Sequence, residues 1–142
     1  MPDTPTTNKL VAVLNKKIEP GKLMNALGHM ATGLGASLSS NPELRLDGYV
    51  DKSGDTHKNI SDNPFIVLAS DNSNKIRTLR NELKAQGIFF VDFISTMTVG
   101  TYSEQKARTN ETPEEELEYY GICFFGDAEK LKELTRKFSL WR

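Results

Sequence analysis

Residues 9–38, KLVAVLNKKIEPGKLMNALGHMATGLGASL, predict a strand followed directly by a helix. Residues 9–14 are an apolar, valine-containing run of strand length. Pro20 suits the first turn of a helix, and the helical pattern continues from there to about Leu38. We therefore expect a buried central strand and a long helix, the opening of an α/β domain.

The predicted helix has an apolar side and a polar side on a helical wheel. The apolar side, which we expect to be buried, holds Leu23, Ala26, Leu27, Met30, Ala31 and Leu34. The opposite side holds Lys22, Asn25, His29 and Thr32. A lysine, an amide and an imidazole on one side can hold an anion or polarise a carbonyl, and Lys22 adds to the positive end of the helix dipole. The alternative is an ordinary solvated surface.

Strands and helices alternate along the rest of the chain. Three more apolar runs have strand length: residues 65–69 (FIVLA), 88–94 (IFFVDFI) and 119–125 (YYGICFF). Helices are expected to end near Gly87 and to begin after Asp127, and the acidic residues 102–118 predict one or two short surface helices. Residues 46–57 indicate a hairpin or an irregular excursion. The alternation predicts a sheet that is at least partly parallel and covered on both faces.

The composition predicts a single globular domain. The chain has 142 residues, of which 37% are hydrophobic and 26% are charged. We expect residues 1–8 to be a flexible start and residues 9–142 to form the domain. No apolar run is long enough to span a membrane, and the start lacks the segments of a secretion signal, so a cytoplasmic protein without membrane association is expected.

Cysteine, histidine and charge content narrow the expected partners. One cysteine, Cys123, and two distant histidines, His29 and His57, cannot form a usual structural zinc site, so we expect neither metal nor cofactor. Cys123 lies in an apolar run and is expected to be an inert core thiol. The net charge of -1 argues against strong nonspecific binding to nucleic acid.

Asp92 is unusual because it interrupts the apolar run IFFVDFI. A carboxylate is disfavoured there by strand propensity and by the cost of partial burial, so another group must compensate it. One alternative is a structural turn in which Thr96, Thr98 or loop amides bond the carboxylate. The other is a functional carboxylate at the carboxyl end of a strand, where open α/β sheets bind their ligands.

Several motifs together resemble known families. A strand followed by Gly21-Lys22 and then His29 resembles the opening of type II peptidyl-tRNA hydrolases, whose pattern is strand, Gly-Lys, Ala-Ala-Gln, His-Ala. Asp92, Thr96 and Gly100-Thr101 resemble that family's Asp-Ala-Gly-x-Thr and Gly-Thr. Nearly the whole chain resembles the domain of unknown function 2000 family, through the runs GHMATGLGA, TMT-GTY and ELEYYGI.

The resemblance implies a fold and a set of site residues. The implied fold is a three-layer α/β/α sandwich around a small mixed, mostly parallel sheet, as in type II peptidyl-tRNA hydrolases, and a homodimer is implied as well. The carried-over catalytic candidates are Lys22, His29, Asp92, Thr96 and Thr101. Their neighbours Asn25, Thr98 and Gly100 are ligand-binding candidates. The chain departs from the hydrolases at Ala26, where they have glutamine, and at Phe93-Ile94, which replaces Ala-Gly.

Two functions of different class are consistent with these residues. In the first, the protein hydrolyses an ester or amide: Asp92 or His29 positions water and Lys22 stabilises developing negative charge, while threonine hydroxyls donate hydrogen bonds. In the second, it is a binding or regulatory module that holds a small anionic ligand in the same cleft. A small molecule or an acyl ester is the expected ligand, and the net charge disfavours tRNA.

Overall fold

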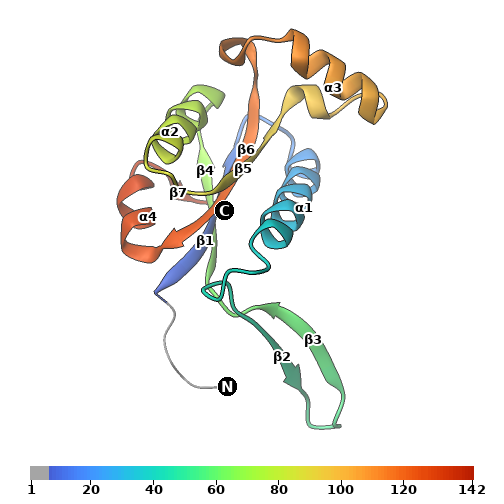
Figure 1. The fold of residues 1–142 in the computed structure, drawn as a ribbon, viewed down its shortest axis with the longest axis vertical. Helices are drawn as coiled ribbons and strands as arrows, with labels where there is room; N and C mark the ends of the chain where they lie inside the picture. Colours follow the sequence, from blue (N-terminus) through green and yellow to red (C-terminus); the bar gives the residue numbers. More distant parts are fainter. Residues whose placement is uncertain (1–6) are drawn as a thin grey trace.

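The apolar run near the start of the chain forms the central strand of a five-stranded sheet (Figure 1). The computed structural model describes residues 7–142, so most of the start that was expected to be flexible lies outside the described residues. The strands are β1 (Asn8–Asn15), β4 (Phe65–Ser70), β5 (Phe90–Ile94), β6 (Tyr119–Asp127) and β7 (Ser139–Leu140). Their order across the sheet is β5-β6-β1-β4-β7.

The expectation of a mostly parallel sheet is wrong. The sheet is mixed, but of its four strand pairs only β1 and β4 are parallel, and the other three are antiparallel. The reason lies in residues 95–118, which turn the chain at one end of the sheet instead of crossing its face. β6 therefore returns beside β5 in the opposite direction, whereas a parallel neighbour would need a crossover connection.

Helices pack on both faces of the sheet (Figure 1). Helix α1 (Pro20–Ser37) lies on one face, and α2 (Ser73–Ala85) and α4 (Ala128–Leu134) lie on the other. Four residues of the predicted apolar side of α1 are buried, Leu23, Ala26, Met30 and Leu34, and the other two, Leu27 and Ala31, are partly buried. Strand β1 divides its side chains between two cores, as the period of two requires: Leu10, Ala12 and Leu14 pack toward α1, and Val11 and Val13 toward α2 and α4.

The expected surface helices are present after the carboxyl end of β5, as α3 (Tyr102–Glu111) and η2 (Glu114–Glu116). A further short helix that was not expected, η1 (Ser95–Met97), precedes them. Helix α3 begins with a capping box, in which Thr101 and Glu104 each accept a hydrogen bond from the other's backbone N–H. None of its residues is fully buried, so α3 rests on the body of the protein instead of being built into the core.

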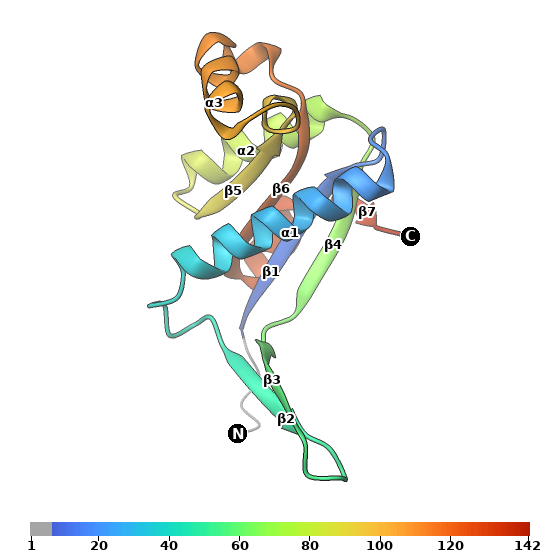
Figure 2. The ribbon, with the colours of Figure 1, turned by 90° about the vertical axis from the view of Figure 1, so that its right-hand side faces the viewer.

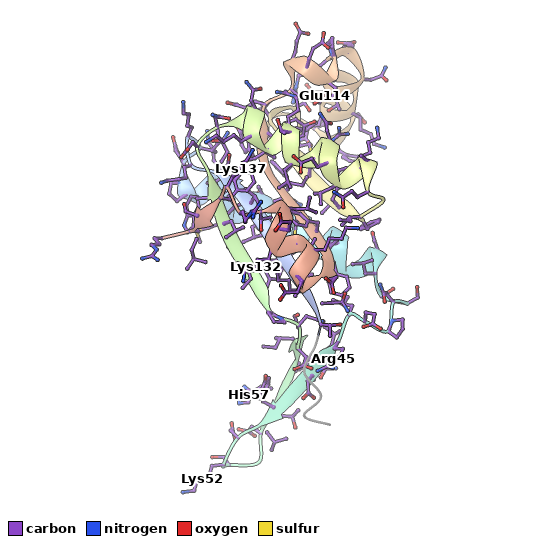
Figure 3. The ribbon with its side chains drawn as sticks, turned by 90° about the vertical axis from the view of Figure 1, so that its left-hand side faces the viewer. Arg45, Lys52, His57, Glu114, Lys132 and Lys137 are labelled. Atoms are coloured by element: carbon purple, nitrogen blue, oxygen red, sulfur yellow. The ribbon has the colours of Figure 1, made fainter. Side chains whose placement is uncertain are left out.

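A separate hairpin projects from the other end of the molecule (Figure 2). It consists of β2 (Leu46–Val50) and β3 (Thr56–Ser61), which confirms the hairpin alternative predicted for this stretch. Figure 3 places Lys52 at the tip and Arg45 at the base, where the Arg45 guanidinium is 2.7 Å from an Asp62 carboxylate oxygen. In residues 7–142, no helix is both long and apolar enough to cross a bilayer.

Candidate functional site

A cavity of about 1080 Å³ lies between α1, β5 and α3. We call it the α1–α3 cleft. Its apolar lining consists of Met30, Val91, Phe93 and Met97. Its other lining residues are Asn25, His29, Gly33, Asp92, Thr98, Tyr102, Gln105, Lys106, Thr109 and Asn110. A mainly apolar wall with a few converging polar groups is typical of small-molecule sites.

Helix α1 contributes one stripe of residues to the cleft. Asn25, His29 and Gly33 are spaced four apart, which places them on the same side of a helix. The His29 ring lies against the Phe93 ring, with centroids 6.0 Å apart and the planes tilted by 37°. A Cβ added at Gly33 would meet nothing within 4 Å, so the wall of the cleft is open at this position.

Helix α3 forms the opposite wall. Its cleft residues follow the spacing of one helical side: Tyr102, Gln105, Lys106, Thr109 and Asn110. The ammonium of Lys106 lies 4.7 Å from the centroid of the Tyr102 ring, a cation–π contact. Within residues 7–142, Lys106 forms no ion pair, so its charge remains available to a ligand.

Two contacts hold α3 against η1. The hydroxyls of Thr96 and Thr109 are 2.6 Å apart, and Thr96 is buried. The Arg108 guanidinium donates to the carbonyl oxygens of Thr96 and Val99. Thr96, expected at the site, therefore bonds α3 from within the structure and does not line the cleft.

The carboxylate of Asp92 lies on the far side of β5 from His29. Val91 and Phe93 pack into the core under α1, whereas Phe90 and Ile94 pack into the core under α2. Because strand side chains alternate, Asp92 points to the α2 side, where its Oδ2 accepts a hydrogen bond of 3.1 Å from Arg80 Nε. Burial raises the pKa of Asp92 above its usual value, and the Arg80 partner offsets this only in part.

An ionic cluster surrounds this pair and attaches η2 to α2. Arg77 Nε lies 2.8 Å from Glu114 Oε2, and the Tyr119 hydroxyl donates to the same oxygen at 2.7 Å. The Tyr119 hydrogen bond and Arg77 lower the pKa of Glu114, while burial and the Glu114 bond raise the pKa of Tyr119. The guanidinium of Arg80 lies 5.9 Å from the centroid of the Tyr119 ring. Arg80 and Asp92 thus belong to a cluster that joins secondary-structure elements.

The remaining expected residues divide between the cleft and its surroundings. Thr98 lines the cleft, although its hydroxyl donates to Ser95 O at 2.6 Å. Thr101 caps α3, and Gly100 has a positive φ of 87° in the turn before it. Lys22 is exposed about two turns before His29 on α1, roughly 10 Å along the axis, and does not line the cleft.

Four of the expected residues line the cleft: Asn25, His29, Asp92 and Thr98, although the Asp92 carboxylate bonds Arg80. The cleft also contains α3 residues that were not expected, Gln105, Lys106 and Asn110. These residues follow Tyr102 with helical i, i+3, i+4 spacing, which is visible in the sequence. Because they are polar, the spacing does not indicate that they face the inside of the protein. No group of three or more His, Cys, Asp or Glu in the described residues is arranged to hold a metal ion.

Comparisons with known proteins support the fold. The structure is similar to that of a protein of unknown function, Atu0240 from Agrobacterium tumefaciens strain C58, with a TM-score of 0.79 and 16% identity over 96% of this chain and 98% of that chain. No match was found among curated proteins. Residues 8–142 match the model of the family described as protein of unknown function DUF2000, and the chain therefore belongs to that family.

Proposed function

We propose that the protein is a binding module that holds a carboxylate-bearing ligand in the α1–α3 cleft. The observation that supports this most strongly is the position of the charges. Lys106 offers a positive charge to the cleft, and the carboxylate of Asp92 is turned away toward Arg80. An anionic ligand would thus meet an ammonium group and an imidazole without an opposing carboxylate between them.

The rest of the lining fits a ligand with an apolar body. Met30, Phe93 and Met97 provide thioether and aromatic surface, which adapts to acyl or aromatic groups. The side-chain amides of Asn25, Gln105 and Asn110 can donate and accept hydrogen bonds and so orient a polar head. The ligand class we propose is a small acyl or aryl carboxylate.

Hydrolysis of an ester or amide is the second candidate, because His29 presents an exposed imidazole to the cleft. In this alternative His29 positions the attacking water. The roles expected for Lys22, Asp92, Thr96 and Thr101 would require these residues to move toward His29. The resemblance to type II peptidyl-tRNA hydrolases supports this candidate, and from it we also propose a type II-like fold and a homodimer. The cytoplasmic location remains a prediction from the sequence.

A ligand assay separates the two candidates. The probe is 4-phenylbutyrate, with its uncharged amide as the matched control ligand, tested by calorimetry and thermal shift on the purified protein. The binding module predicts that the acid binds and the amide does not. Binding of the acid should be weaker in Lys106→Gln and unchanged in the hairpin-tip variant Lys52→Gln. Hydrolysis of peptidyl-tRNA or of 4-phenylbutyrate esters by the wild type, and its loss in His29→Gln, would instead support the hydrolase and contradict the binding module.

A further inference from the structure

Among the residues that the structure describes, 7–142, strand β5 is the last strand on its side of the sheet, and β6 is its one sheet neighbour. Alternate backbone N–H and C=O groups of such a strand point outward, away from the sheet. Within residues 7–142, no backbone hydrogen bond joins Phe90–Ile94 to α1 or α3. The outer edge of β5 is therefore a row of backbone donors and acceptors without a protein partner from either helix.

The α1–α3 cleft reaches this edge. It contacts three consecutive residues of β5, Val91, Asp92 and Phe93. Because neighbouring side chains point to opposite faces, Val91 and Phe93 present their side chains on the α1 side, whereas Asp92 directs its carboxylate to Arg80 on the α2 side. Since β5 is the edge strand, a ligand in the cleft lies beside the outermost strand of the sheet. In Figure 2, β5 forms the side of the sheet that lies below α3.

The dimensions suit a short extended peptide. Strand β5 has five residues, and five extended residues span roughly 17 Å. A peptide beside it would place alternate side chains on the α1 side, where Met30, Phe93 and Met97 provide apolar contacts. On the same side, Lys106 and His29 are available to a carboxylate.

We infer that β5 binds an extended peptide as an added sixth strand, with an apolar side chain inserted against Phe93 and Met97 and an acidic side chain directed to Lys106. This inference rests on the proposed function, because it uses the same cleft, and it deepens that proposal by naming a peptide as the molecule that carries the carboxylate and the apolar group. Main-chain hydrogen bonds to β5 supply register and affinity, and the cleft selects the side chains. The peptide belongs to a partner protein and carries an apolar and an acidic residue two positions apart, so that both side chains face the α1 side.

The test begins with selection of random heptapeptides displayed on phage against the intact protein. A parallel selection uses Gly33→Leu, in which the new side chain projects into the open cleft wall. Gly28→Leu is the matched control, because Gly28 also has open space but does not line the cleft. Both substitutions replace glycine within a helix by a better helix former, so folding of the variants is expected to be maintained.

Selected peptides are then synthesised and measured by fluorescence polarisation. We expect Gly33→Leu to weaken binding by about tenfold or more and Gly28→Leu to leave it unchanged. N-methylation of the peptide backbone, one position at a time, should abolish binding at alternate positions, because a paired strand uses every second N–H. Amide exchange of residues 90–94 should slow in the complex.

Three outcomes would overturn the inference. One is the absence from the selection of peptides with an apolar and an acidic residue two positions apart, and another is tolerance of N-methylation at every position. The third is slowed exchange of residues 90–94 in the free protein as its concentration rises, which would assign the edge to a second copy of the chain. If 4-phenylbutyrate binds while no peptide does, only the peptide inference fails, and if neither binds, the proposed function fails with it.

Discussion

The Asp92 side chain and His29 lie on opposite faces of the edge strand β5. The Asp92 carboxylate bonds Arg80 at 3.1 Å on the α2 side, whereas the His29 ring lies against Phe93 on the α1 side. The resemblance to the hydrolases implies that both residues belong to one catalytic site. In this chain they lie in two separate environments. Asp92 belongs to the ionic cluster around Tyr119, and His29 belongs to the cleft.

Replacing Asp92 by asparagine should not destabilise the protein. Burial disfavours the charged form, and the asparagine Oδ1 can still accept the bond from Arg80, so Asp92→Asn should leave stability unchanged or raise it by up to about 1 kcal/mol. Urea unfolding measures this difference. The control is Arg80→Met, which leaves a half-buried carboxylate unpaired and should cost about 1–3 kcal/mol. A larger loss in Asp92→Asn than in Arg80→Met would show that the carboxylate is a structural acceptor.

The stability contribution of Asp92 should depend on pH with a defined sign. Its pKa is raised from 3.8 in the folded state, so its contribution is present below pH 3.8 and is lost as pH rises through the folded pKa. Wild type should therefore lose stability relative to Asp92→Asn as the pH increases from about 3.5 toward neutrality. Paired urea melts cancel the other titrating groups. A difference that is constant, or that grows in favour of wild type, would contradict the burial of this carboxylate.

Thr96 and Thr109 should be energetically coupled. Their hydroxyls are 2.6 Å apart and form one of the few contacts that attach α3, so Thr96→Val should cost about 1 kcal/mol and speed amide exchange in residues 102–111. Thr109→Val should have a similar effect, and the double variant should cost less than the sum. Additive effects in a double-mutant cycle would show that the two hydroxyls do not interact in solution.

Two glycines should respond in opposite ways to alanine. A Cβ at Gly121, in the first half of β6, would lie 2.8 Å from Leu14 Cδ2 and 3.2 Å from Val13 O, so Gly121→Ala should destabilise by about 1–3 kcal/mol. Gly33 has open space in the cleft, and Gly33→Ala should stabilise by up to about 1 kcal/mol through helix propensity. Thermal unfolding of both variants measures the contrast. Equal effects would mean that the wall of the cleft is closed at Gly33.

The sequence predicts the elements of this fold better than their arrangement. The buried side of α1, the apolar strands and the cap at Asp127 follow from local spacing and chemistry, and the structure contains them. The direction of β6 does not follow from the sequence. Residues 102–118 could turn the chain at the end of the sheet or cross its face, and their sequence pattern does not distinguish these two paths.

The site is predicted less completely for a similar reason. The polar side of α1 identifies Asn25 and His29, but the second wall of the cleft comes from a polar helix whose position depends on tertiary contacts through Thr96 and Arg108. The local sequence also does not show to which face of the sheet the Asp92 side chain points. In the run IFFVDFI both alternating sets are apolar, so periodicity does not indicate which helix layer each side chain faces.

The most direct test of the central claim is a titration of the isotope-labelled protein with 4-phenylbutyrate, followed by amide chemical shifts. Binding in the α1–α3 cleft predicts saturable shifts confined to residues 25–33, 90–98 and 102–110, and their loss in Gly33→Leu but not in Gly28→Leu. Absence of shifts up to millimolar ligand, or shifts that map to the hairpin or to α2 and α4, would contradict the assignment of the α1–α3 cleft as the binding site.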